Sequence, residues 1–213
     1  MNDGLRLAEL LTMRLCHDIS GPLGTLMGSI EMVNEDPEAA EEALALATEV
    51  SAGLVKRLRF LRAAWGGPAG ALSAEEFRAL AEGLPQRRVA IHFDAVAASE
   101  PYSPAATRVL LNVLLLAAES LPGGGNVTVA GDPARDVTVS ISGPRAAWPP
   151  RLAACMADEA AAWEALAAEG SETSRALQGP LTVLIATSAG IRLGFLMAAR
   201  QEPVPPLILS HIG

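Results

Sequence analysis

The sequence has only two cysteines in 213 residues, Cys16 and Cys155, and they show no pairing pattern. We therefore expect both to be reduced thiols of a cytoplasmic protein. Basic tracts are missing as well, and the formal net charge is −8, so nucleic acid is not expected as a main partner. The first residues lack the basic and apolar regions of a signal peptide, which favours the same cytoplasmic location.

One hydrophobic run, residues 180–199, is long and apolar enough to resemble a membrane span. Arg192 lies within it, and Ala189 and Gly190 interrupt it. We therefore interpret the run as a buried helix, a turn and a strand, and we expect no membrane contact. Hydrophobic residues, mostly Ala and Leu, make up 50% of the chain, which allows a packed core and argues against disorder.

The first 67 residues predict a helical hairpin. Apolar residues recur at spacings of three and four over residues 4–34 and over residues 37–65, and the short break between the two helices makes them pack antiparallel. The apolar positions are Ile19, Leu23, Leu26, Ile30 and Val33, then Ala43, Ala47, Val50, Leu54, Leu58, Leu61 and Trp65. One hairpin cannot bury both stripes, so the sequence predicts a homodimer whose two hairpins form a four-helix bundle.

His17 lies on the side of the first helix opposite its apolar stripe. At about 100° per residue the stripe falls roughly 160–240° from His17, so the imidazole is presented to the outside. The residues that share or flank this face are Arg14, Ser20, Gly21, Gly24 and Gly28. A glycine costs about 1 kcal/mol of helix stability relative to alanine, so three on one face indicate close approach by a partner. The alternative is that His17 is an ordinary solvated residue.

The second helix ends in a group of basic residues. Folding the hairpin about residues 35–36 brings His17 level with residues near 54, within about one or two turns of Lys56, Arg57 and Arg59. A phosphoryl group or an acidic partner would meet positive charge there. The alternative is a solvated charged face that complements the helix dipole.

A segment rich in glycine and proline, residues 66–70, marks the boundary to a second domain, residues 71–213. The pattern there is mixed α/β, so the expected fold class is α + α/β, with a two-layer sandwich after the hairpin. The expected helices span residues 74–83, 104–121, 150–169 and 180–188, and the expected strands span residues 88–94, 126–130, 136–142, 191–199 and 206–211.

The residues around His17 resemble a known motif. Asp18 follows His17 directly, and Pro22 and Leu23 complete a pattern similar to the phosphoacceptor motif of two-component signalling, H-[E/D]-x-x-x-P-[L/V]. In that family the histidine lies on the first helix of a hairpin, and hairpins from two chains form a four-helix bundle. The resemblance implies that His17 carries a phosphoryl group. Asp18 would orient the ring or accept its proton, or it is simply a solvated helix residue.

The order of elements in residues 71–213 resembles the ATP-binding domain of histidine kinases. Asn112 matches the first asparagine of the family's N-box. The second asparagine, which in the family helps to hold magnesium, is Leu116 here, and a hydrocarbon cannot bind a hard cation.

Two further nucleotide motifs of that family are altered. The aspartate of its D-x-G-x-G motif aligns with Ile141, and the second glycine aligns with Arg145. The later phosphate-binding glycine box is reduced to Gly179 and Pro180, and proline lacks a backbone donor. The resemblance therefore implies a degenerate ATPase-like domain that does not bind ATP. The alternative is a generic α/β layer that never bound it.

A phosphoacceptor hairpin followed by a degenerate kinase-like domain closely resembles the ChpT-like histidine phosphotransferases of alphaproteobacterial phosphorelays. The resemblance implies that His17 takes a phosphoryl group from one receiver-domain aspartate and gives it to another, without autokinase activity. The implied partners are the receiver domains of response regulators and of a hybrid kinase. No cofactor of the chain's own is implied, because magnesium would be supplied with the receiver.

Two other functions stay open from the sequence. An active histidine autokinase with an atypical ATP site would bind ATP and label itself. A dimeric scaffold or adaptor for response regulators would tolerate the loss of His17. One departure from related kinases concerns Gly21, where they often carry a hydroxyl or an amide, so phosphatase-like assistance is not expected.

Overall fold

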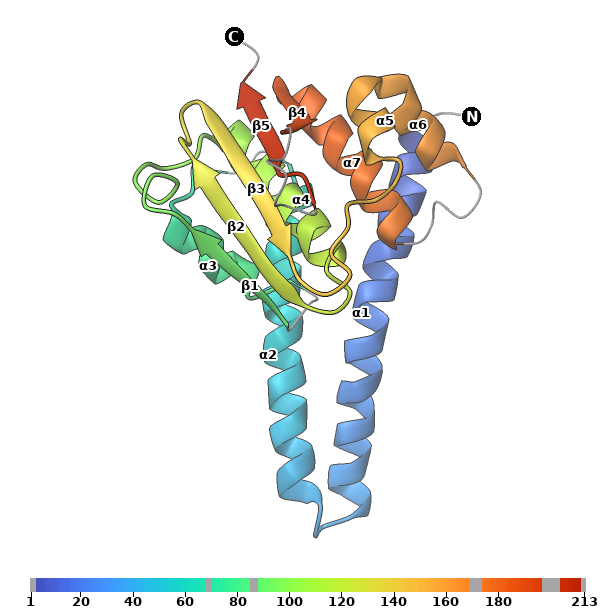
Figure 1. Ribbon diagram of the computed structural model, residues 1–213. Coiled ribbons are helices and arrows are strands. Elements are labelled where there is room, and N and C mark those ends of the chain that lie inside the picture. The colour runs from blue at the N-terminus through green and yellow to red at the C-terminus, as the bar shows by residue number, and fades with distance from the viewer. Residues whose placement is uncertain (1–2, 68–69, 85–87, 169–173, 197–203, 212–213) are drawn as a thin grey trace.

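The computed structural model describes residues 3–67, 70–84, 88–168, 174–196 and 204–211. The chain begins with a long antiparallel helical hairpin and continues into a sheet flanked by helices (Figure 1).

The hairpin consists of α1 (Asp3–Glu35) and α2 (Ala40–Trp65) (Figure 1). Both predicted helices are confirmed. The second helix begins a few residues later than predicted because Asp36 stabilises a turn, in which its Oδ1 accepts the backbone N–H of Glu38 at 3.0 Å.

A five-stranded sheet forms one layer of the second part of the chain. Its strands are β1 (Val89–Phe93), β2 (Gly125–Gly131), β3 (Asp136–Ser142), β4 (Ile191–Phe195) and β5 (Leu207–His211). The order across the sheet is β1-β2-β3-β5-β4, with β1 parallel to β2 and the other neighbouring pairs antiparallel. In β3 the buried residues are Val137, Val139 and Ile141, so one face of the sheet is packed.

The helices that accompany the sheet are α3 (Ala74–Ala81), α4 (Pro104–Glu119), α5 (Leu152–Ala157), α6 (Glu159–Ala167) and α7 (Ser174–Ser188). The prediction of one helix over residues 150–169 is wrong. The backbone of Asp158 is extended and ends α5, and its side chain accepts the N–H of Ala160 at 2.9 Å and so caps α6.

The start of α7 also differs from the prediction. The helix begins at Ser174, so Pro180 lies inside it and not at its start. Tertiary contacts explain why the proline does not end the helix: Gln178 and Thr182 donate from their side chains to the backbone oxygen of Asn112 on α4, at 3.3 and 3.4 Å.

The central helix of the molecule is α4. Its residues 109–118 are all buried, and it contacts α2, α7 and the strands β2, β3 and β4. Away from the α1–α2 turn, α2 packs on α4 and α1 contacts α6, whereas the half of the hairpin that contains the turn extends away from the sheet (Figure 1). The predicted combination of helices with a sheet is confirmed. The dimeric bundle and the domain boundary between residues 67 and 71 stay predictions.

In the described part of the chain, no helix has both the length and the apolar character needed to cross a bilayer. The apolar run noted in the sequence is the second half of α7, a turn at Gly190 with φ of 67°, and β4. The interpretation of this run is therefore confirmed up to residue 196, and residues 197–199 lie outside the described part.

Candidate functional site

His17 lies about halfway along α1, and its side chain is 82% exposed. Ser20 is exposed as well, and so is a surface that we call the glycine face, formed by Gly21, Gly24 and Gly28. A Cβ added at any of these three glycines would meet no atom within 4 Å, so packing within the chain does not require glycine there. The glycine face is therefore open to a partner.

Beside His17, Asp18 belongs to a cluster of buried ion pairs. Its Oδ2 accepts from Nε of Arg14 at 2.9 Å and from Nη2 of Arg57 at 2.6 Å. Its Oδ1 lies 3.6 Å from Nδ1 of His17. Arg14 also donates from Nη2 to Oε1 of Glu119 at 2.5 Å. Charged side chains from α1, α2 and α4 thus meet beneath the exposed imidazole.

The prediction that Arg14 and Arg57 contact a partner at the surface is wrong. Arg14 is 3% exposed and Arg57 is 7% exposed. Arg14 precedes Asp18 by one helical turn and shares its side of α1, which faces α4. The wide polar arc beside His17 therefore contains two kinds of residue: the glycines face solvent, and Arg14 faces the second part of the chain.

The prediction that His17 on α1 lies within about two turns of Arg57 on α2 is confirmed, because Arg57 contacts Asp18, the residue next to His17. Of the other basic residues in this group, Lys56 and Arg59 are exposed. Nζ of Lys56 donates to Glu82 at 2.6 Å, so part of its charge is already balanced. Arg59 is therefore the stronger candidate for a contact with an acidic partner.

Burial raises the pKa of the acidic groups in this cluster, whereas the neighbouring arginines lower it. Burial disfavours the charged form of Asp18, but the hydrogen bonds and charges of Arg57 and Arg14 outweigh it and lower the pKa of Asp18. Burial raises the pKa of Glu119, and the charge of Arg14 offsets this only in part. A carboxylate with a lowered pKa is suited to orient the imidazole and poorly suited to remove its proton.

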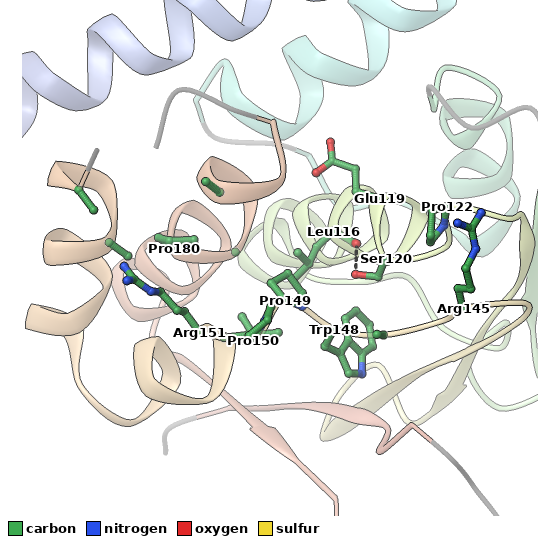
Figure 2. A pocket seen from close by; sticks show the side chains of 16 residues that line it. Leu116, Glu119, Ser120, Pro122, Arg145, Trp148, Pro149, Pro150, Arg151 and Pro180 are labelled. Atoms are coloured by element: carbon green, nitrogen blue, oxygen red, sulfur yellow. Dashed lines mark hydrogen bonds between the residues drawn. The ribbon is translucent and has the colours of Figure 1, made fainter. Parts of the chain in front are cut away.

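A cavity of about 760 Å³ lies where the second part of the chain was expected to hold degenerate nucleotide motifs (Figure 2). Leu116, Arg145, Gly179 and Pro180 line it together, whereas Ile141 is buried in β3. Arg145 has φ of 59°, a conformation that glycine adopts readily, which agrees with its alignment to a motif glycine. The structure therefore brings together positions from all three altered motifs.

Sequence reasoning missed Glu119 and gave no role to Asn112. Nδ2 of Asn112 donates to the backbone oxygen of Ala64 at 3.0 Å, and its Oδ1 accepts from Nε1 of Trp65 at 3.1 Å. Asn112 thus joins α4 to the end of α2. The signal that could have revealed Glu119 is an acidic residue directly after the unbroken apolar run of residues 113–118.

Comparison with known proteins identifies the class. Residues 74–201, more than half of the chain, match the family model of the histidine phosphotransferase C-terminal domain. The chain therefore belongs to the histidine phosphotransferase family.

Individual relatives agree with this assignment. The chain is 26% identical over 204 residues to protein phosphotransferase ChpT of Brucella abortus (strain 2308), covering 92% of this chain and 93% of the relative. Its fold is similar to that of a bacterial phosphotransferase solved at 1.7 Å, with a TM-score of 0.71 and 24% identity over 97% of this chain and 95% of the other. A likeness to the cytoplasmic segment of the histidine kinase QseC, with 17% identity over 80% of this chain and 93% of the other, has a TM-score of 0.36 and supports no argument.

Proposed function

We propose that this protein is a phosphorelay histidine phosphotransferase, in which His17 takes a phosphoryl group from the aspartate of one receiver domain and passes it to the aspartate of another. The observation that carries the proposal is an imidazole that is 82% exposed on a helix, with a carboxylate oxygen 3.6 Å from its Nδ1. Membership of the histidine phosphotransferase family supports the same class of reaction.

The chemistry depends on which ring nitrogen Asp18 faces. A small rotation of His17 closes the 3.6 Å gap to a hydrogen bond from Nδ1–H to Oδ1 of Asp18. This bond keeps the proton on Nδ1 and leaves the lone pair of Nε2 for in-line attack on phosphorus. As the N–P bond forms, the P–O bond to the receiver aspartate breaks, and its electron pair stays on that carboxylate. The ring becomes positively charged, Asp18 balances the charge, and the second transfer reverses these steps.

The receiver domain docks over the glycine face. Without side chains there, the receiver can bring its aspartate close to the helix that carries His17. Ser20 lies at the edge of this surface, with its hydroxyl bonded to the backbone oxygen of Cys16 at 2.7 Å. Lys56 and Arg59 guide an acidic receiver from the neighbouring helix.

Magnesium is supplied with the receiver. Over the described residues, no group of three or more His, Cys, Asp or Glu side chains could hold a metal ion. The carboxylate beside His17 is also engaged by Arg14 and Arg57, which leaves it poorly suited as a metal ligand.

The protein acts as a homodimer. The large apolar side chains that the single chain leaves exposed on one side of its hairpin include Leu23, Met27, Ile30, Leu44, Val55 and Leu58. Leu23 and Ile30 belong to the stripe expected to be buried, yet they are 44% and 51% exposed. A second hairpin packed against this surface would complete a four-helix bundle and remove it from water.

The cavity does not serve ATP chemistry. Leu116 offers no oxygen to magnesium, and Pro180 offers no backbone donor to a phosphate. Glu119 lines the cavity, but its carboxylate points away from Trp148 (Figure 2) and accepts a hydrogen bond from Arg14. We therefore expect phosphate to enter the protein from a receiver and not from a nucleotide.

Reconstitution of the relay tests this function. A receiver domain with a labelled aspartyl phosphate should label the protein, and a second, unlabelled receiver should then take up the label. His17→Gln should block both steps and still bind the receivers. Labelled ATP alone should leave the protein unlabelled, which separates a phosphotransferase from an autokinase. Passage of label between the two receivers in the presence of His17→Gln at the wild-type rate would contradict the proposal.

A further inference from the structure

The orientation of Asp18 depends on how its two oxygens are divided between neighbours. Oδ2 accepts from both Arg14 and Arg57, at 2.9 and 2.6 Å. This leaves Oδ1 directed at Nδ1 of His17, 3.6 Å away. If the arginines moved, the carboxylate would be free to rotate, and the hydrogen bond that selects the ring tautomer would weaken.

Arg14 is itself held from the far side. Its Nε contacts Asp18, and its Nη2 contacts Oε1 of Glu119 at 2.5 Å, so one planar guanidinium bridges two carboxylates. Because the group is rigid, a contact at one edge determines the direction of the other edge. Glu119 is the last residue of α4, the most deeply buried helix, and is a stable anchor for this arrangement.

We propose that Glu119 is a positioning residue for phosphotransfer: acting through Arg14, it holds Asp18 in the orientation that keeps the proton of His17 on Nδ1 and leaves Nε2 as the nucleophile. The inference rests on the proposed function of His17. It gives α4, in the histidine phosphotransferase C-terminal domain, a role in the reaction that needs no nucleotide.

Stability alone is a weak explanation for this buried pair. Removing two charges from water offsets most of their attraction, so a buried ion pair adds little net stability. Burial raises the pKa of Glu119 despite the nearby Arg14. In addition, Oε2 of Glu119 and Nη1 of Arg14 are buried without a hydrogen-bond partner among the described residues. The Arg14–Glu119 pair is therefore better suited to orient Asp18 than to stabilise the fold.

Two variants of the 213-residue protein distinguish a role in orienting Asp18 from a role in stabilising the fold. Glu119→Gln keeps the shape of the side chain and removes its charge. Arg14→Lys keeps the positive charge but has one nitrogen, which cannot bridge Asp18 and Glu119 as the guanidinium does. Glu159→Gln is the matched control, because Glu159 is an exposed residue on α6 whose partner is Nε1 of Trp163 at 3.3 Å.

The first measurement is the tautomer of neutral His17, read by ¹⁵N NMR without any receiver, and the second is the transfer rate from a labelled receiver. The wild type and the control should be protonated mainly on Nδ1. Both test variants should shift toward protonation on Nε2 and transfer about tenfold more slowly.

An unchanged tautomer in both variants would overturn the inference, even with slower transfer, because the effect would then be one of folding or docking. If one variant fails to fold, the other still decides the question. The tautomer is measured on the protein alone, so a failure of this inference is distinguishable from a failure of the wild type to accept phosphate, which would instead contradict the proposed function.

Discussion

The role of Asp18 depends both on its neighbour in the sequence, His17, and on tertiary contacts. Its place next to His17 is evident from the chain, but its partners are Arg57, 39 residues later, and Arg14 one turn earlier. These contacts favour an orienting role over proton removal, because they lower the pKa of the carboxylate against the opposing effect of burial.

Asp18 should therefore make the stability of the fold depend on pH. Its folded-state pKa lies below the unfolded value of about 3.9, so its stabilising contribution is complete above that value and is lost as pH falls through the lower folded pKa. At neutral pH, Asp18→Asn should lower the free energy of unfolding by about 2 kcal/mol, since two buried guanidinium groups lose a charged acceptor.

Urea titrations between about pH 7 and pH 2.5 check this expectation. The stability difference between wild type and Asp18→Asn should be constant from neutral pH to about pH 5 and should shrink below about pH 4. Asp136→Asn, a change at an exposed aspartate in β3, is the control. If the stability difference grew on acidification, the pKa of Asp18 would not be lowered on folding, and the prediction would be wrong.

At the scale of elements, one side of α1 faces the second part of the chain, and we propose that another side meets the receiver. The glycine face is open, and nothing within the chain would collide with side chains placed there. Gly24→Leu should therefore raise helix stability by about 1 kcal/mol and leave the fold intact. It should also slow transfer by about tenfold or more, because the added side chain keeps the receiver aspartate away from His17.

Single-turnover transfer from a labelled receiver measures the effect of Gly24→Leu. Ala154→Leu is a matched control, since Ala154 is exposed on α5, outside the hairpin. If Gly24→Leu accepts phosphate as fast as the wild type, the receiver does not dock over the glycine face.

Periodicity was sufficient to predict the hairpin and the exposure of His17, because both depend on spacing within one helix. Periodicity could not distinguish exposed Ser20 from buried Arg14. Both lie on the polar side of α1, but α4 covers this side near Arg14 and leaves it open to solvent near Ser20. The passage of α7 through Pro180 was missed for a similar reason, because Gln178 and Thr182 bond to Asn112 on α4, far away in the sequence. The division of α5 from α6 is a local effect: Asp158 accepts the N–H of Ala160 and caps α6, a signal that the sequence contains.

At the scale of the whole molecule, the exposed apolar surface of the hairpin is the basis of the proposed homodimer. Met27 and Leu58 are 56% and 39% exposed, and burial of this remaining surface in a bundle would contribute about 1 kcal/mol for each side chain. The double change Met27→Asp and Leu58→Asp should therefore dissociate the dimer.

Light scattering at micromolar concentration checks this prediction. The wild type should have the mass of two chains, and the double variant the mass of one chain with unchanged circular dichroism of the sheet and helices. Ala153→Asp, at an exposed position of α5, should stay dimeric. A stable wild-type monomer would rule out the bundle.

The most direct test of the account is the position of the phosphoryl group. The protein is mixed with a phosphorylated receiver, stopped at alkaline pH, digested and analysed by mass spectrometry. We expect an acid-labile phosphoryl group on the peptide that contains His17, attached through Nε2, and none after His17→Gln. Phosphate on His92 or His211, on a carboxylate or hydroxyl group, or on no residue of this chain would contradict it.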